Sequence, residues 1–240
     1  MEIQIKTSQE EAPSIDNLVI DAVDLRRTYR VGVHQEVQAL RGVNLKIFAG
    51  ECVAVKGRSG SGKTTMLNCI GGLDRPTSGL VRVFGQDLTK LSDKELTRYH
   101  REKVGFIFQS FGLTSTYSAF ENVELMLRIA GSGLRHRRER AIHCLELVGL
   151  IKWRNHRPNE MSGGQQQRLA IARALANQPR LVLADEPTGK LDTATARDIF
   201  GLFRKIVVEE GVTVLMAAHD PLVDEYADRV LRLKDGNIVD

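Results

Sequence analysis

The segment from Gly57 to Thr65 constrains this chain more than any other. Its sequence, GRSGSGKTT, fits the pattern G-x-x-x-x-G-K-[ST] of a loop that surrounds phosphate groups. The apolar run before it, Glu51–Lys56, predicts a short buried strand, and Lys63–Gly71 after it predicts a helix. A strand, a glycine-rich loop and a helix in this order are the context that the motif requires. The segment therefore predicts an α/β fold built around a phosphate site.

Each residue type in this loop has a physical reason to be there. Glycines let the backbone turn tightly and bring its N–H groups close to an anion, and the N-terminus of the next helix adds the positive end of its dipole. We expect Lys63 to contact the outer phosphates and Thr64 to place its hydroxyl on Mg²⁺. The predicted nucleotide-binding residues of the loop are Gly57, Arg58, Ser59, Gly60, Ser61, Gly62, Lys63, Thr64 and Thr65.

The length and composition are those of an ordinary globular protein. A chain of 240 residues can build one α/β domain or two small lobes. No apolar run approaches the roughly 20 residues of a membrane span, and residues 1–17 lack the apolar segment of a signal peptide. We expect residues 1–17 to form a flexible tail and the chain to stay in the cytosol. Cys52, Cys69 and Cys144 lack metal-site spacing, and we interpret them as buried apolar side chains.

The net charge of +4 is only slightly basic. The densest basic run, Arg135–Arg140, begins a helical pattern whose inner face would hold Ala141, Leu145, Val148 and, less clearly, Ile142. We interpret this run as a solvated helix face, with a contact near a membrane as the alternative. Aromatic residues are few and none lies within the run, so we expect no nucleic-acid partner.

Apolar runs predict strands along most of the remaining chain. These runs are Leu18–Leu25, Val43–Phe48, Leu80–Phe84, Val104–Phe108, Leu181–Ala184, Val212–Ala217, Val230–Leu233 and Ile238–Val239. Helical patterns begin at a Ser92–Glu95 capping box, at Ser162, and at Asp192 or Thr193.

The block between Gln109 and Pro158 has no strand pattern. A helical pattern runs there from Phe120 to Leu150, with a break at 131–133. We therefore predict a core with a mostly parallel sheet, an antiparallel β subdomain near the N-terminus, and an inserted α-helical subdomain at about 110–177. The whole domain would span 18–240.

Five polar side chains come just after apolar strands, or after the phosphate loop: Lys63, Gln109, Asp185, Glu186 and His219. Because the carboxyl ends of parallel strands meet at one edge of a sheet, we expect these side chains to gather there. Asp185 is the expected carboxylate near Mg²⁺, and Glu186 could hold or deprotonate an attacking water. Gln109 could ligate Mg²⁺ or orient water. A histidine such as His219 is, by itself, more often structural.

A second anion site is predicted where Ser162, Gly163, Gly164 and Gln165 begin a helix. A capping serine and two glycines leave backbone N–H groups free to bind an anion. One nucleotide does not need two such sites far apart in one chain. In a head-to-tail dimer, however, each nucleotide would lie between the phosphate loop of one subunit and the serine-glycine site of the other.

With these motifs the sequence resembles ATP-binding cassette (ABC) ATPases over residues 18–240. Its segment Met161–Arg168, MSGGQQQR, is similar to the LSGGQ motif of that family, with Met for Leu. The resemblance implies that ATP and Mg²⁺ are the cofactors and that Tyr29 stacks on adenine. It implies that Gln109 contacts Mg²⁺ beside the surface facing a membrane partner. It also assigns the catalytic base to Glu186, the γ-phosphate contact to His219, and a loop crossing the dimer interface to Asp192.

Three further segments resemble one branch of the family, which serves macrolide export, lipoprotein release and peptide resistance. These segments are Gly71–Gly79, Arg157–Glu160 and Ala184–Gly189, whereas Lys190 departs from the Asn usual in that branch. The resemblance implies an ATP-hydrolysing homodimer that drives a separate integral-membrane permease, as an exporter or a mechanical system. Such a subunit would lie on the inner face of the cell membrane.

Two other classes of protein remain open. A soluble ABC ATPase could act on ribosomes or DNA. Ribosome-acting relatives, however, usually join two cassettes in one chain, and DNA-repair relatives carry long coiled coils or zinc-binding insertions, and this sequence shows neither feature. A phosphate-loop GTPase or kinase would leave Ser162–Gln165 without a role, and the chain has no guanine-reading N-K-x-D segment at a fitting place.

Overall fold

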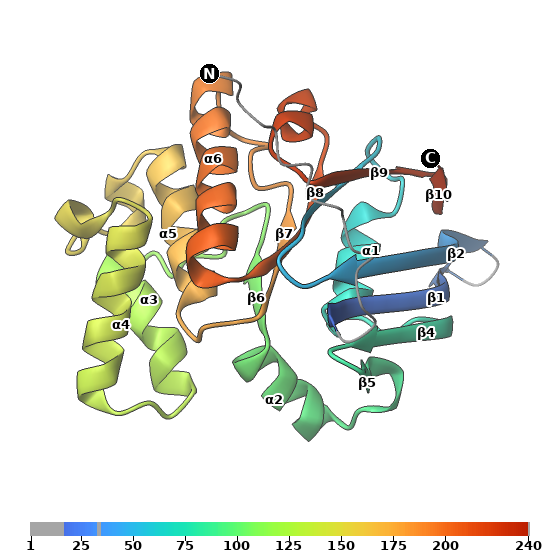
Figure 1. Ribbon diagram of the computed structural model, residues 1–240, viewed down its shortest axis with the longest axis horizontal. Helices are drawn as coiled ribbons and strands as arrows, with labels where there is room; N and C mark the ends of the chain where they lie inside the picture. The colour runs from blue at the N-terminus through green and yellow to red at the C-terminus, as the bar shows by residue number, and fades with distance from the viewer. Residues whose placement is uncertain (1–16, 33–34, 240) are drawn as a thin grey trace, which may run out of the picture.

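Two β-sheets organise the computed structural model, which describes residues 17–32 and 35–239 (Figure 1). The larger sheet has the strand order β10-β9-β3-β8-β7-β6. Its strands are β3 (Cys52–Lys56), β6 (Val104–Ile107), β7 (Leu181–Asp185), β8 (Thr213–Ala218), β9 (Arg229–Lys234) and β10 (Asn237–Val239). All neighbouring pairs are parallel except β9 and β10, so the predicted mostly parallel sheet is confirmed.

The smaller sheet is antiparallel and has the order β2-β1-β4-β5. Its strands are β1 (Leu18–Val31), β2 (Gln35–Phe48), β4 (Ser78–Val83) and β5 (Gln86–Asp87). The first two are much longer than predicted, and Tyr29 lies inside β1 rather than after it. Asp24 has a positive φ of 47° and the register shifts nearby, which interrupts the apolar alternation. Beyond that point most of the hairpin is exposed, so no apolar pattern marks it.

Six helices pack around these sheets in the described part of the chain. They are α1 (Lys63–Ile70), α2 (Asp93–Glu102), α3 (Ala119–Ile129), α4 (Leu134–Leu147), α5 (Gly163–Leu175) and α6 (Thr193–Glu210). Capping boxes at Ser92, Ser118 and Ser162 begin α2, α3 and α5, and Asp192 caps α6. Helices α3, α4 and α5 lie together on one side of the larger sheet in Figure 1. Their existence as a separate subdomain at about 110–177 stays a prediction.

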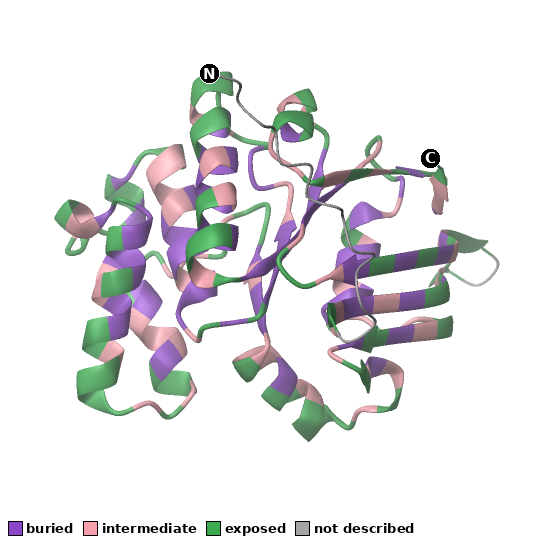
Figure 2. Ribbon diagram, viewed as in Figure 1, coloured by how far each residue is buried: buried purple, intermediate pink, exposed green. Residues whose placement is uncertain are grey.

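The central strands β3, β7 and β8 of the larger sheet are buried on both faces, which explains their continuous apolar runs. Alternate residues of β3 enter two different clusters: Cys52 and Ala54 pack with α5 and α6, whereas Val53 and Val55 pack with α1 and the smaller sheet. Figure 2 shows the buried residues, in purple, concentrated along β7 and β8 at the centre. The carboxyl ends of these strands are thereby held on a rigid support.

The three cysteines are buried, as the sequence predicts. Burial raises the pKa of Cys52 and of Cys69 to about 12 and that of Cys144 to about 11. Thiols with such pKa values carry almost no thiolate at neutral pH, so these cysteines are packing residues.

The basic run at the start of α4 is only partly solvated, which corrects the sequence interpretation. Arg135 keeps 92% of its side chain exposed, but Arg140 keeps only 8%. Arg140 donates hydrogen bonds to Leu175 O and Ala176 O at the end of α5 and to Glu210 Oε2 at the end of α6. The helical turn points Arg140 inward, where its long side chain reaches these acceptors.

The predicted tail at 1–17 lies almost entirely outside the described residues. Within the described ranges, none of the helices combines the length and the apolar character that a bilayer crossing needs.

Candidate active site

The phosphate loop joins β3 to α1, as the motif requires, and its glycines are needed for geometry. Gly62 has a φ of 107°, and a Cβ there would lie 2.4 Å from Ala39 O. Neither the conformation nor the space admits another residue type. Gly62 also precedes α1 without a side-chain cap, so no side chain occupies the first N–H groups of the helix. These N–H groups and the helix dipole form an anion site.

Lys63 lies inside the loop rather than in solvent, with 5% of its side chain exposed. Its Nζ donates hydrogen bonds to Gly57 O at 2.9 Å and Arg58 O at 3.2 Å, and it lies 3.5 Å from Glu186 Oε1. The ammonium is therefore fixed at the loop, where it can meet a phosphate without first losing side-chain entropy.

Thr64 and Asp185 form an oxygen pair suited to Mg²⁺. The Thr64 hydroxyl donates to Asp185 Oδ2 at 2.9 Å. Burial raises the pKa of Asp185, the Thr64 hydrogen bond opposes this, and the nearby Glu186 carboxylate raises it further. A bound cation would relieve this cost. The described residues contain no cluster of three His, Cys, Asp or Glu that could hold a metal alone. One carboxylate and one hydroxyl fit Mg²⁺, which takes its other ligands from phosphate and water.

Glu186 has an unusual backbone conformation, with a φ of 47°. Its N–H still donates to Ala217 O on β8, but the positive φ turns the chain out of β7 at this residue. Gln109 Nε2 donates to Glu186 Oε2 at 2.8 Å, and His219 Nδ1 lies 3.7 Å from Oε1. A non-glycine residue at positive φ stores strain and is typical of functional sites. The structure thus brings Lys63, Gln109, Asp185, Glu186 and His219 to one edge of the sheet.

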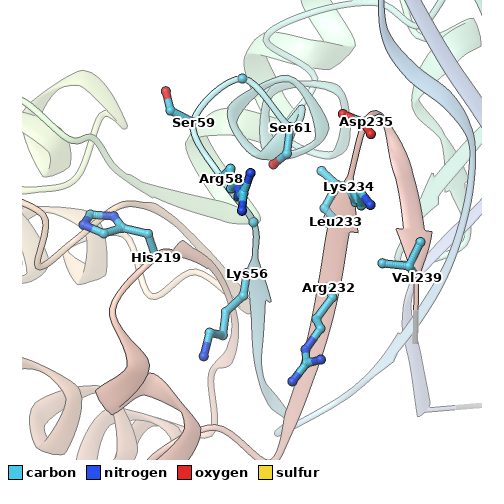
Figure 3. Close-up of a pocket in the computed structure, with 12 residues that line it drawn as sticks. Lys56, Arg58, Ser59, Ser61, His219, Arg232, Leu233, Lys234, Asp235 and Val239 are labelled. Atoms are coloured by element: carbon cyan, nitrogen blue, oxygen red, sulfur yellow. The ribbon is translucent and has the colours of Figure 1, made fainter.

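Two hollows border the phosphate loop, and Ser59 and Gly60 line both of them. The smaller, of about 270 Å³, is lined by loop residues with Gln109 and Glu186. The larger, of about 820 Å³, is lined by the first residues of the loop, His219 and the region around the β9–β10 turn. Figure 3 shows the Lys56 and Arg232 side chains extending away from Ser59 and Ser61, with His219 on the left of Lys56 and Arg232 on its right. We place the phosphates in the smaller hollow, because Lys63 and Thr64 line it.

The predicted second anion site lies elsewhere in the chain. Ser162 caps α5, its Oγ accepting from Gln165 N, while Gln165 Oε1 accepts from Ser162 N at 2.9 Å. In Figure 1, α5 and α1 stand on opposite sides of the central strands β7 and β8. Gly164 packs against the first turn of α6, where a Cβ would lie 2.6 Å from Thr195 Cγ2. Asp192 caps that same turn of α6, so it lies near the start of α5, which Ser162 caps.

Tyr29 belongs to a cluster that sequence reasoning did not find. Its hydroxyl donates to Asp74 Oδ2 at 2.6 Å, and the guanidinium carbon of Arg27 lies 4.4 Å from the centre of its ring. Arg27 and Tyr29 are two residues apart, and such residues lie on the same face of a strand. A prediction that extended β1 to Tyr29 would therefore have placed the two side chains together. The contact with Asp74 joins segments that are far apart in the chain, so no local sequence pattern predicts it.

Comparisons with known proteins agree with this geometry. A family model described as ABC transporter matches residues 40–189. The lipoprotein-releasing system ATP-binding protein LolD 1 of Rhodopseudomonas palustris is 46% identical over 93% of this chain and 98% of that protein. The macrolide export ATP-binding/permease protein MacB of Syntrophobacter fumaroxidans is 47% identical over 92% of this chain but 31% of that protein. The chain therefore spans about a third of the macrolide-export relative and nearly all of the lipoprotein-releasing one.

A solved structure of an ATP-binding cassette of Methanocaldococcus jannaschii has the same fold. It is a dimer in a post-hydrolysis state bound to ADP and Pi, it is 44% identical, and it superposes with a TM-score of 0.85. The alignment covers 92% of this chain and 97% of that one. The chain belongs to the ABC transporter family of ATP-binding proteins. The predicted fold, the ATPase class, and ATP with Mg²⁺ as cofactors are confirmed.

Proposed function

We propose that this ABC ATPase works as a head-to-tail homodimer on the inner face of the cell membrane, where it drives a separate permease. One observation carries the proposal. The groups suited to ATP hydrolysis gather beside the phosphate loop, while the Ser162 site faces elsewhere on the same chain. Each chain then holds half of two nucleotide sites, and only two chains together complete them. The archaeal relative is a dimer bound to ADP and Pi, which supports a dimer here as well.

The roles of the residues at the phosphate loop follow from their positions. Lys63 and the backbone N–H groups bind the outer phosphates, and Thr64 with Asp185 holds Mg²⁺, which neutralises phosphate charge when it is bound. Glu186 takes the proton of an attacking water, because its carboxylate borders the hollow that receives the phosphates. Gln109 orients Glu186 and contacts Mg²⁺, and His219 contacts the γ-phosphate.

The remaining predicted residues bind the other parts of the nucleotide. Tyr29 stacks on adenine. The N–H groups after Ser162, with Gly163, Gly164 and Gln165, bind the γ-phosphate held by the second subunit. Asp192 lies near the start of α5, which Ser162 caps, and so sits in the same interface.

A mostly apolar hollow next to Phe108 supports the permease as partner. It has a volume of about 260 Å³, and its lining combines apolar side chains with the polar Thr64, Asn68 and Asp185. The apolar side chains are Leu67, Leu73, Phe106, Ile107, Phe108 and Leu183. Leu73 is 47% exposed and Phe108 is 40% exposed, although both are large and apolar. We propose that an apolar segment of the permease docks here. Because Phe108 precedes Gln109, which bonds to Glu186, docking at this hollow is coupled to the hydrolytic centre.

The names of the relatives favour one branch of transporters. LolD belongs to a lipoprotein-releasing system and MacB to macrolide export. We propose that this chain likewise serves export or the mechanical extraction of a membrane substrate. A soluble ABC ATPase acting on ribosomes or DNA is the alternative that an experiment must exclude.

A tagged Glu186→Gln variant, solubilised with Mg·ATP from membranes of the source cell, tests this function. We expect an integral-membrane permease to co-purify. Adding Leu73→Glu and Phe108→Glu to the Glu186→Gln variant should abolish the capture of the permease. The same two changes in a chain that keeps Glu186 should leave its ATPase activity intact. Val208→Glu is the matched control, since Val208 is 76% exposed on α6 and should tolerate the charge. Ribosomal or DNA-repair proteins in place of a permease would overturn the transporter assignment.

A further inference from the structure

Three side chains from two segments form a closed cluster next to α1. Arg27 and Tyr29 lie two residues apart on β1, and so on the same face of the strand. Asp74 lies in the turn after α1. Arg27 Nε donates to Asp74 Oδ2 at 2.9 Å, and the other end of its guanidinium lies 2.8 Å from Oδ1. The Tyr29 hydroxyl also donates a hydrogen bond to Asp74 Oδ2, at 2.6 Å. A single carboxylate therefore fixes both side chains.

The Arg27 guanidinium covers one face of the Tyr29 ring. The Arg27 guanidinium carbon lies 4.4 Å from the ring centre, at the distance of a cation–π contact. Arg27 keeps 24% of its side chain exposed and Asp74 keeps 21%, so solvent screens this pair far less than the exposed Asp24–Arg26 pair on the same strand. An aromatic ring bound to Tyr29 must lie on the face opposite Arg27.

The turn that carries Asp74 is itself tied to α1 and to β1. Asp74 N–H donates to Asn68 O in α1 at 3.2 Å, and Thr77 N–H donates to Arg26 O in β1 at 2.8 Å. The Tyr29 ring is thus held at a fixed position relative to the helix that carries Lys63 and Thr64. The spacing between a stacked base and the phosphate loop is set by these contacts.

We propose that Arg27 and Asp74 are positioning residues for the nucleotide base. They hold the Tyr29 ring with one face covered, so that adenine stacks on the other face while its phosphates reach the loop. The inference rests on the proposed stacking of adenine on Tyr29 and adds the two residues that prepare the ring. Preorganising the ring lowers the entropy cost of binding the base, so the effect falls on nucleotide affinity.

Affinities for ATP and for inorganic triphosphate, which has no base, test the proposal. We expect Arg27→Gln and Asp74→Asn each to weaken ATP binding about three- to tenfold and to leave triphosphate binding unchanged. Tyr29→Ala should weaken ATP binding about tenfold, because base stacking is lost. At saturating ATP, kcat of the Arg27 and Asp74 variants should stay within about twofold of the parent, while KM rises.

The control is the exposed pair on the same strand. Arg26→Gln and Asp24→Asn should leave ATP affinity unchanged, since that pair touches neither Tyr29 nor α1 in the described structure. If Tyr29→Ala does not weaken ATP binding, the proposed adenine stacking fails. If Tyr29→Ala weakens it but Arg27→Gln and Asp74→Asn do not, only the positioning role falls.

A structural effect has a different signature. Equal losses of ATP and triphosphate affinity in Asp74→Asn would mean that the turn supports the phosphate loop itself, and the positioning role would be rejected. Tyr29→Phe guards against misfolding, because it keeps the ring and removes only the hydroxyl. It should weaken ATP binding less than Tyr29→Ala and leave triphosphate binding unchanged.

Discussion

The side-chain amide of Gln109 donates a hydrogen bond to Oε2 of Glu186 over 2.8 Å. The contact joins the residues that follow β6 and β7. The other oxygen of Glu186 lies 3.5 Å from Lys63 Nζ and 3.7 Å from His219 Nδ1. Glu186 therefore shares its partners with the phosphates and Mg²⁺ that we expect there. We expect bound phosphate to draw Lys63 Nζ away from Glu186, which leaves Oε1 free to hold a water while Gln109 keeps Oε2 in place.

Replacing Glu186 by Gln should separate binding from hydrolysis. The amide keeps the shape of the side chain but cannot accept a proton from water, so we expect hydrolysis to slow by about 10²–10⁴-fold. ATP binding should persist, and an ATP-bound dimer should accumulate. Phosphate release and size-exclusion chromatography with ATP measure the two effects. Glu209→Gln, an exposed acid on α6, is the control. Hydrolysis at the normal rate in Glu186→Gln would place the base elsewhere.

Asp185→Asn should raise the free energy of unfolding and abolish ATPase activity. Burial raises the pKa of Asp185 above its usual 3.8, which means that the ionised form is disfavoured in the fold. At neutral pH the neutral amide avoids this cost and can still accept from Thr64. We expect a gain of about 0.5–1 kcal/mol in the free energy of unfolding, with ATPase activity lost through weak Mg²⁺ binding. Urea unfolding without nucleotide measures the first effect.

The gain in the free energy of unfolding from Asp185→Asn should depend on pH. A carboxyl with a raised pKa stabilises the fold fully below its unfolded value of 3.8, and this stabilisation is lost as pH rises through the raised pKa. The advantage of Asp185→Asn should therefore be largest at neutral pH and should shrink as pH falls toward 3.8. An advantage independent of pH would show that charge burial is not its cause.

Ser162→Arg should block dimerisation but not ATP binding by the monomer. The arginine would fill the surface that we expect to face the phosphate loop of the second subunit. The change also removes a helix cap, which costs about 1 kcal/mol. Ser118→Arg is a matched control, because Ser118 caps α3 through the same kind of capping box. Both variants should lose similar stability, and only Ser162→Arg should fail to dimerise with ATP. Loss of ATP binding by the Ser162→Arg monomer would contradict the shared site.

The features that sequence predicted well are local. The phosphate loop depends on nine consecutive residues, and the caps at Ser92, Ser162 and Asp192 depend on spacings of three. Asp185 and Glu186 were found because a continuous apolar strand precedes them. Their gathering with Gln109 and His219 followed from the rule that parallel strands end at one edge.

The features that sequence missed depend on long-range contacts. The outer half of the β1–β2 hairpin is exposed, so hydrogen bonding between strands holds it without an apolar pattern. Asp74 meets Arg27 and Tyr29 only after β1 and the turn after α1 are placed side by side. Arg140 looked like the rest of its basic run, because its burial is decided by α5 and α6.

Arg140 gives the clearest stability prediction. Its side chain is only 8% exposed, and its guanidinium bonds to Glu210 and to the carbonyl oxygens of Leu175 and Ala176. Removing it in Arg140→Ala leaves those acceptors without their donor, so we expect a loss of about 3–5 kcal/mol in the free energy of unfolding. Arg135→Ala on the same helix should change it by no more than about 0.5 kcal/mol, because its ion pair with Glu139 is exposed.

The Arg140→Ala loss should also depend on pH, because Glu210 titrates. Burial alone would raise the pKa of Glu210, but the hydrogen bonds from Arg140 and His143 more than offset it, and the pKa is lowered from 4.5. A carboxylate with a lowered pKa stabilises the fold above its unfolded value and loses that contribution as pH falls through the folded one. Urea unfolding from neutral pH to below pH 4.5 should therefore show the two proteins converging. A constant difference would assign the loss to packing of the Arg140 side chain rather than to its charge.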